Sequence, residues 1–261
     1  MHPGHNEAVL SLAPAPAAER AAVPQDVAIA GVDGCKAGWV VVLAHPLTRD
    51  ARQHQVMVCA QFAEVLALTP APTVLAVDMP IGLLDVPQPG GRTCDRLARQ
   101  VLGRRASSVF TPPARTLLDA TSYAQVRDYG LSIQSFHILP KIREVDRLMT
   151  PVLQQRLYEA HPELAFARLA GQPMRARKNM VAGREERLQT LERSTIPFLA
   201  NIRLACALAL QHYPRRQLAP DDVLDAFALL HTAWCIVQGQ AYCLPSPAPC
   251  DARGLRMEIC Y

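Results

Sequence analysis

The sequence contains no Cys-x-x-Cys pair and no apolar segment of about 18 residues, and only 5% of its 261 residues are aromatic. The missing Cys-x-x-Cys pairs argue against a zinc ribbon or a thioredoxin-type dithiol. Without a long apolar segment, the chain has no candidate membrane-spanning helix, and no membrane partner is expected. The low aromatic content gives little support to recognition of single-stranded nucleic acid by base stacking.

The charge balance is nearly even, with a net charge of +4. Half of the residues are hydrophobic and 19% are charged, which excludes a disordered protein, a collagen-like fibre and a coiled coil. The positive charges are nearly all arginines, whose planar guanidinium group suits phosphate and carboxylate. A polyanionic partner is therefore compatible with the composition. The composition therefore predicts a folded domain with ample apolar material for a core.

The eight cysteines are read as reduced thiols of a cytoplasmic protein, mostly in the core, because a chain of this length needs no disulfide staples. Cys243 and Cys250 lie in a proline-rich stretch, where oxidation could pair them.

Composition divides the chain into a leader and one domain. Residues 1–25 hold seven alanines and four prolines without a basic start or a long apolar stretch. We interpret them as a disordered leader and not as a signal peptide. Residues 26–261 are then expected to form a single domain.

The first half of that domain has the sequence pattern of a β-sheet. VAIAGVDGCKAGWVVVLAHP predicts a strand, a tight turn and an antiparallel strand, followed by a third strand at about 55–60 and a helix near 62–68. TVLAVDMPIGL predicts a fourth strand, parallel to the first, that is buried on both faces and stops near Asp78 because Pro80 disfavours helix before it. This order predicts an α/β fold of the RNase H-like type, a mixed five-stranded sheet flanked by helices.

The second half is mainly helical. Residues 91–150 are expected to form a helical insertion over the carboxyl edge of the sheet. LQQRLYEAH predicts the fifth strand, and GLRMEICY an edge strand at the end of the chain. Asp221 is the expected cap of a long buried helix beginning at PDDVLDA. The other predicted helices span about 93–101, 122–129, 142–149, 183–193 and 196–213.

Four aspartates are the candidate chemical groups. Asp33 and Asp78 end neighbouring parallel strands, so both should project from one sheet edge, where a divalent cation such as Mg²⁺ or Mn²⁺ would balance them. Asp222 and Asp225 share a helix face. Three of them have a structural alternative: Asp33-Gly34 is a common turn, Asp78 could cap a strand end, and Asp222 suits a helix start. Asp225 stands in an apolar helix, where an unpaired carboxylate is expensive.

Nine motifs occur in one order over about residues 27–261: GVDGCKAGW, AVDMPIGL, RTCDRLARQVLG, SSVFTPPAR, KIREVD, YEAHPELAF, the K-x₄-G-x₃-R spacing of KNMVAGREER, DDVLDA and GLRMEICY. In this set the chain resembles a domain-of-unknown-function family described as predicted RNase H-like nucleases. The resemblance implies an RNase H-like fold and a metal-dependent nuclease. Asp33, Asp78, Asp222 and Asp225 match the acids of the RuvC-like subgroup.

A further acid of that superfamily is less clear in this chain. Glu64 is the only candidate for the acid on the first helix, and a solvent-facing carboxylate explains it as well. Glu159, in YEAHPELAF, is the expected supplementary ligand. His161 is expected to be a hydrogen-bonded structural histidine.

The implied mechanism is two-metal hydrolysis of a phosphodiester, in which one ion activates water and the other neutralises the leaving oxygen. Basic residues in the motifs are the expected phosphate contacts. They are Arg92, Arg96, Arg99, Arg104, Arg105, Lys141, Lys178 and Arg184.

Two other functions stay open. An actin-like or sugar-kinase phosphotransferase also starts with a strand ending in Asp-Gly, but its phosphate hairpin carries Thr or Ser, which GCKAG lacks. A nucleic-acid-binding protein without catalysis is the second alternative. The sequence leaves the choice of DNA or RNA open, and equally the choice between a monomer and a homodimer.

Overall fold

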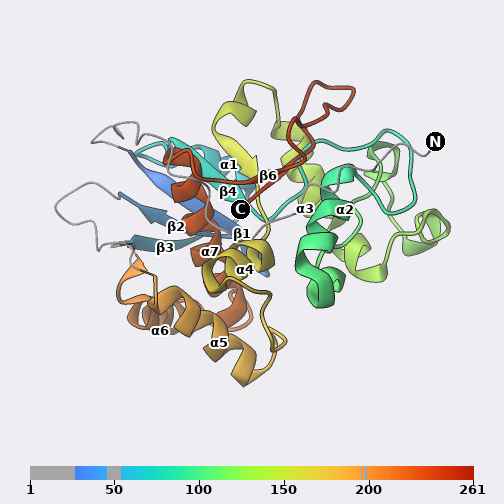
Figure 1. Ribbon diagram of the computed structural model, residues 1–261. Helices are drawn as coiled ribbons and strands as arrows, with labels where there is room; N and C mark the ends of the chain where they lie inside the picture. The colour runs from blue at the N-terminus through green and yellow to red at the C-terminus, as the bar shows by residue number, and fades with distance from the viewer. Residues whose placement is uncertain (1–26, 46–53, 195, 197–198) are drawn as a thin grey trace, which may run out of the picture.

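A computed structural model describes residues 27–45, 54–194, 196 and 199–261. Its centre is a mixed sheet of five strands in the order β3-β2-β1-β4-β5 (Figure 1). The bounds of these strands are β1 Ile29–Cys35, β2 Gly38–Ala44, β3 His54–Cys59, β4 Val74–Val77 and β5 Leu157–Glu159. The expected leader lies outside the described residues.

The order of the strands follows from two kinds of connection. The hairpin DGCKAG joins β1 to β2 in antiparallel register, with Cys35 opposite Gly38. The crossover through the helix α1 (Phe62–Leu66) brings β4 beside β1 in parallel, with Val32 opposite Val77. β5 pairs in parallel on the far side of β4. The α/β class and the five-stranded mixed sheet are therefore confirmed.

Helices cover both faces of this sheet (Figure 1). α7 and α4 bury their apolar sides with one face, and α1 and α3 with the other. The α-helices are α1 Phe62–Leu66, α2 Thr93–Leu102, α3 Ile133–Leu148, α4 Pro162–Ala170, α5 Val181–Glu192, α6 Ile202–His212 and α7 Pro220–Val237. Short 3₁₀ turns are η1 Gly103–Ser108, η2 Arg115–Leu117, η3 Tyr123–Gln125, η4 Arg127–Tyr129 and η5 Leu153–Gln155.

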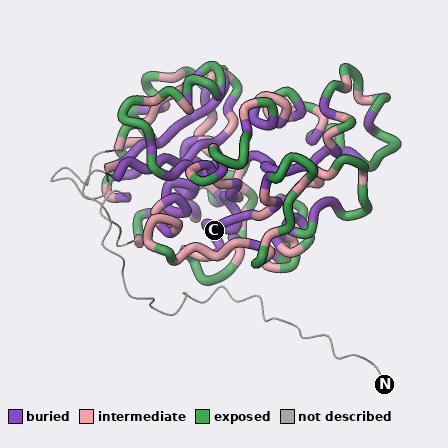
Figure 2. The backbone as a smooth tube through the Cα atoms, turned by 90° about the horizontal axis from the view of Figure 1, so that it is seen from above, coloured by how far each residue is buried: buried purple, intermediate pink, exposed green. Residues whose placement is uncertain are grey.

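α7 packs against β1 at unusually short range. A Cβ on Gly31 would lie 2.1 Å from the carbonyl oxygen of Ala226 and 2.2 Å from the amide nitrogen of Leu230. Only a glycine allows the two backbones to approach this closely. Burial is highest in β1, β2, β4 and this helix. Figure 2 shows the buried segments gathered in the interior, with exposed and partly exposed segments around them.

The opposite face is built around two aromatic rings. Trp39 and Phe62 meet edge to face with centroids 4.8 Å apart, and Ile142 and Val145 of α3 are buried in the same cluster. The indole Nε1 of Trp39 donates to Glu144 at 3.1 Å. α3 thus covers a face of the sheet, and the expectation that the whole insertion lies over the carboxyl edge is wrong for this helix.

The insertion differs from prediction in its helices as well. α2 is where it was expected, but the helix expected at 122–129 is the pair of 3₁₀ turns η3 and η4. α3 begins at Ile133, not at 142, and continues through Pro140. Ser132 caps its start by accepting from the amide of Ser135 at 3.0 Å, and apolar burial of the later turns compensates for the hydrogen bond that Pro140 cannot donate.

Three other boundaries were misplaced. β5 starts at Leu157 because the preceding residues form η5. α6 starts at Ile202, six residues later than expected. The start of α7 is capped by Asp222, whose Oδ2 accepts from the amide of Ala219 at 3.0 Å, and not by Asp221.

The chain ends in a small sheet of its own. β6 Cys243–Leu244 and β7 Ile259–Cys260 are antiparallel, and Cys260 also forms a parallel bridge to Ala160 beyond β5. A disulfide joins Cys243 to Cys260, while Cys250 is free and exposed. The expectation of eight reduced thiols is therefore wrong, and the disulfide is not the Cys243–Cys250 pair that oxidation could have formed, because the last strand places Cys260 directly opposite Cys243.

No helix in the described ranges is both long and apolar enough to cross a bilayer.

Candidate metal centre

Asp33 and Asp78 lie near neighbouring strand ends on the α7 face of the sheet. Alternation along β1 places Asp33 on the same face as Ile29, which is buried with α7. Asp78 directly follows β4, and its amide donates to the carbonyl of Val32 at 3.0 Å. The amide of Gly34 donates to Asp33 Oδ1 at 2.7 Å and orients that carboxylate. The register confirms that the two residues are neighbours on adjacent parallel strands, but β1 does not end at Asp33 as predicted, because it continues to Cys35 in the hairpin with β2.

Asp225 reaches the same edge from α7. Its neighbours Leu224 and Ala226 are core residues, and Asp225 itself is only 1% exposed. Oδ2 accepts from the Lys178 ammonium at 2.7 Å. Oδ1 is buried and has no hydrogen-bond partner. A buried, unpaired carboxylate oxygen is expensive, so this atom is the strongest sign of an absent ligand.

Electrostatics join these residues into one cluster. Burial raises the pKa of Asp33 well above its usual value, and the charges of Asp78 and Asp225 raise it further, while Lys178 lowers it. Burial also raises the pKa of Asp78 and of Asp225, and Lys178 opposes both shifts. Carboxylates that repel one another in this way become stable as anions when a cation lies among them.

Asp222 takes a different role from Asp225. Its carboxylate caps α7, and burial raises its pKa to about 6. One of its oxygens is therefore committed to the backbone of Ala219. The pair is brought to the same end of α7 as predicted, but Asp225 is the member that faces the other two aspartates.

The donor set fits a hard divalent cation. Mg²⁺ prefers carboxylate oxygens and is commonly held by one or two of them, together with waters and substrate phosphates. No three of these aspartates have ligand atoms all within 4.8 Å of one another in the part of the chain that the structure describes. An ion at this edge would thus contact two carboxylates directly, those of Asp33 and Asp78 on the adjacent strands, and a water that it retains would supply the unpaired Asp225 Oδ1 with a hydrogen bond.

Glu159 lines a small cavity together with Asp78, but its carboxylate is held by other partners. Leu157 packs on the α1 and α3 face, so alternation along β5 turns Glu159 to that face as well. Glu159 accepts from the amide of Ile81 at 2.7 Å and from the Arg92 guanidinium at 2.7 and 2.5 Å. Its proposed place as a supplementary ligand therefore needs correction: it anchors Arg92.

The predicted phosphate contacts also prove to have internal partners. Arg92 is buried between Asp95 and Glu159, so it is not accessible to a substrate. Arg105 pairs with Glu163. The others donate mainly to backbone oxygens or a threonine hydroxyl: Arg96 to Gly91 and Thr93, Arg99 to Gly90, Val109 and Thr111, Arg104 to Pro173, Lys141 to Gly38 and Arg184 to Asn179.

The K-x₄-G-x₃-R spacing contains two residues that our sequence reasoning did not select. Gly183 lies where a Cβ would be 1.9 Å from the carbonyl oxygen of Arg177. Arg187 is fully buried, pairs with Glu163 and donates to the carbonyls of Ala176 at 3.2 Å and Gly183 at 2.9 Å. The spacing itself was the available signal, because Arg187 is its last residue, whereas we selected Arg184.

His161 is structural, as expected. It precedes α4 and its Nδ1 accepts from the amide of Glu163 at 3.2 Å, while its other ring nitrogen lies 3.3 Å from the carbonyl of Ser108. Glu64 accepts from the amide of Ala60 at 2.9 Å and is exposed. Both residues therefore have hydrogen-bond partners of their own, and His161 in addition lies near Asp78, whose pKa its charge lowers.

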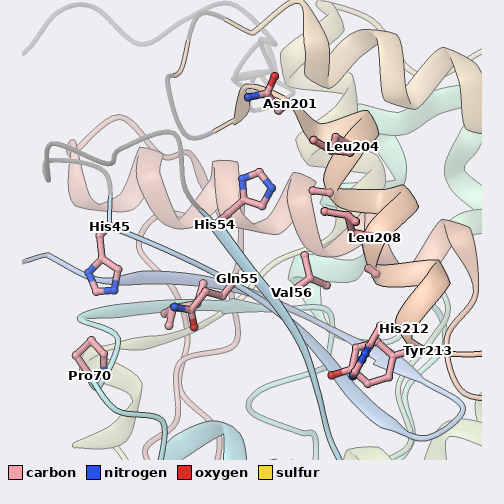
Figure 3. Close-up of a pocket in the computed structure, with 13 residues that line it drawn as sticks. His45, His54, Gln55, Val56, Pro70, Asn201, Leu204, Leu208, His212 and Tyr213 are labelled. Carbon is pink, nitrogen blue, oxygen red and sulfur yellow. The ribbon is translucent and has the colours of Figure 1, made fainter.

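Two other features lie apart from this centre. A cavity of about 910 Å³ opens between β3 and α6, lined by residues such as His54, Leu208 and Tyr213, and none of the four aspartates lines it (Figure 3). Cys243, Glu258 and Cys260 have ligand atoms within 4.8 Å of one another, but the two sulfur atoms are already joined to each other.

A known protein family shares the sequence pattern of most of this chain. Residues 31–249 match the family model DUF429, described as a protein of unknown function. The chain belongs to the DUF429 family. The resemblance to a domain-of-unknown-function family is thereby confirmed, and the matched range contains all four aspartates. No curated protein matches the chain, and no solved structure does.

Proposed function

We propose that this DUF429 chain has an RNase H-like fold and is a metal-dependent nuclease that hydrolyses phosphodiester bonds in DNA or RNA. The strand order, with β4 parallel to β1 and two acids at their adjacent ends, supports the fold assignment. The observation that carries the function is Asp225 Oδ1, a buried carboxylate oxygen without a partner beside two further carboxylates.

The protein's own residues have distinct tasks in this proposal. Asp33 and Asp78 would hold Mg²⁺ or Mn²⁺, and the amide of Gly34 fixes the direction of the Asp33 carboxylate. When bound, the ion would supply Lewis-acid stabilisation of charge on a phosphate oxygen. The buried helix α7 keeps Asp225 at the edge of the site.

Substrate contacts come from the rim of the insertion. Arg96 and Arg104 are exposed, and Arg99 is half-buried beside them. These arginines can exchange a backbone carbonyl for a phosphate without exposing a buried charge. Arg92 is withdrawn from the phosphate-binding set because its partners are buried carboxylates.

The test is cleavage of a labelled panel of single-stranded DNA, duplex DNA, RNA, hybrid and four-way junction with Mg²⁺ or Mn²⁺. Asp78→Asn should lower the rate at least about 100-fold, because metal-assisted stabilisation is worth several kcal/mol. Asp128→Asn is the matched control, since its side chain is 78% exposed, and it should cleave as the wild type does.

Cleavage that is equal in wild type and Asp78→Asn would refute the proposal, and so would the absence of any metal-dependent cleavage. Thermal stabilisation by a nucleoside triphosphate would instead favour the phosphotransferase alternative. Nucleic-acid binding that Asp78→Asn leaves unchanged, without cleavage, would favour the binding protein.

A further inference from the structure

Lys178 places a positive charge inside the acidic cluster. Its ammonium lies 2.7 Å from Asp225 Oδ2, whose side chain is 2% exposed, while the lysine side chain itself is 45% exposed. Asp225 raises the pKa of Lys178 above its usual value, and Asp33 and Asp78 act in the same direction. The ammonium is therefore within electrostatic reach of three carboxylates at once.

The loop that carries Lys178 is fixed on its N-terminal side. The Glu186 carboxylate accepts from the amides of Arg175 and Ala176, each at 2.8 Å. The buried Arg187 donates to the carbonyl of Ala176, the next backbone group along. These bonds hold the chain two residues before Lys178, so little freedom is left in where its side chain starts.

The same loop is fixed on its C-terminal side by α5. Gly183 allows the first turn of this helix to touch the backbone of Arg177, and the amide of Met180 donates to the carbonyl of Arg177 at 3.1 Å. Lys178 lies inside this constrained turn. The three spaced residues of K-x₄-G-x₃-R thus act together, because Gly183 and Arg187 position the Lys178 side chain against Asp225.

Charge counting then limits the number of metal ions. Asp33, Asp78 and Asp225 carry three negative charges when ionised, while Asp222 lies in the first turn of α7, where the Ala219 amide and the positive end of the helix dipole offset its charge. One ammonium and one divalent ion balance three carboxylates, whereas two divalent ions with the ammonium would leave a positive excess in a buried site. Loss of the ammonium would expose Asp225 as an uncompensated buried charge.

We propose that Lys178 replaces one of the two metal ions of the expected mechanism, so that the centre binds a single divalent ion per chain. The inference rests on the proposed function, since it concerns the same aspartates. Lys178 is a positioning residue for Asp225 and for the charge balance of the site. The two-metal arrangement expected from the family resemblance is replaced by one ion and one tethered ammonium.

The test counts Mn²⁺ ions on the full chain by isothermal titration calorimetry and electron paramagnetic resonance. Wild type should bind one ion, and Lys178→Met should bind two, because the vacated position is again surrounded by carboxylates. Lys178→Arg should restore a single ion. Lys141→Met is the matched control, because that lysine also lies near Asp33 but donates to the carbonyl of Gly38, and it should leave one ion bound.

The outcomes separate the two proposals. Two ions in the wild type, or an unchanged count in a Lys178→Met protein with native circular dichroism, would overturn the inference and leave the nuclease proposal standing. No ion in the wild type, or one that Asp33→Asn fails to weaken, would overturn both. A single ion in a chain that cleaves nothing would overturn the nuclease proposal alone.

Discussion

The approach of α7 to β1 makes Gly31 the position where the smallest added group should cause the largest damage. Gly31→Ala adds one methyl group, which would lie 2.1 Å from the oxygen of Ala226, 2.2 Å from the nitrogen of Leu230 and 2.8 Å from the carbonyl carbon of Leu229. All three atoms belong to the backbone, so no side-chain rotation relieves the overlap. The helix itself has to move away from the sheet.

The expected cost follows from how α7 is buried. Overpacking a core costs about 1–3 kcal/mol when side chains can adjust. Here the adjustment is a shift of a helix whose residues from Val223 to Ala233 are all buried, so we expect about 3 kcal/mol or more. For a domain of this size, that loss lowers the midpoint of thermal unfolding by roughly 6–12 °C.

Urea unfolding followed by circular dichroism measures this loss, and Gly34→Ala supplies the control. A Cβ on Gly34 would meet only the end of the Lys141 side chain, at 3.1 and 3.4 Å, and this chain can swing aside. Gly34→Ala should therefore stay within about 1 kcal/mol of wild type. If Gly31→Ala is equally mild, the described contact between α7 and β1 is wrong, and the placement of Asp225 beside Asp33 fails with it.

Three further predictions concern stability. Burial and the nearby Arg168 lower the pKa of His231, which lies beside Cys235, to about 3. Below about pH 6.5 the unfolded chain therefore binds a proton that the folded chain does not bind, so between pH 6.5 and 4 the free energy of unfolding of wild type should fall by about 1.4 kcal/mol per pH unit relative to His231→Leu. The same dependence of unfolding on pH in both proteins would contradict this. Under oxidising conditions, Cys260→Ser should cost about 3 kcal/mol in urea unfolding, because the disulfide spans 17 residues, while Cys250→Ser should cost nothing measurable. Arg187→Met should cost about 3 kcal/mol, because the buried Glu163 carboxylate keeps only the partly exposed Arg105 as a charge partner and the carbonyls of Ala176 and Gly183 lose a donor. Arg184→Met, at a half-exposed side chain, should stay within about 0.5 kcal/mol, and equal losses would show that burial of Arg187 is not the cause.

The strands around the aspartates could be predicted because local patterns decide them. β1 and β4 are continuous apolar runs that end in Asp33 and just before Asp78, and parallel pairing places such ends side by side. Glu159 could not be placed in the same way. β5 has three residues, too few for a period of two to show which face each side chain takes, and the pairing with Arg92 spans 67 residues of chain.

The partners of the buried charged residues also could not be predicted from the sequence. Lys178 and Asp225 are 47 residues apart, and the pair exists only because α4, α5 and α7 pack together. Eight basic residues in the motifs were all expected to bind phosphate, because an arginine in a sequence shows its charge but not its neighbours. In the fold, they donate instead to carbonyls, carboxylates and hydroxyls of the protein, and five of the eight find these partners outside the insertion.

The contacts of Lys178, Gly183 and Arg187 explain the spacing of the K-x₄-G-x₃-R segment. On a helix, Gly183 and Arg187 lie one turn apart on the same side, so both can meet the loop that precedes α5. The backbone of Gly183 approaches the loop closely because it has no side chain, and Arg187 donates to the loop carbonyl of Ala176, so the two together hold Lys178 in place. The segment is therefore a support for one ammonium, and the carboxylate that this ammonium contacts, Asp225, belongs to the candidate metal centre.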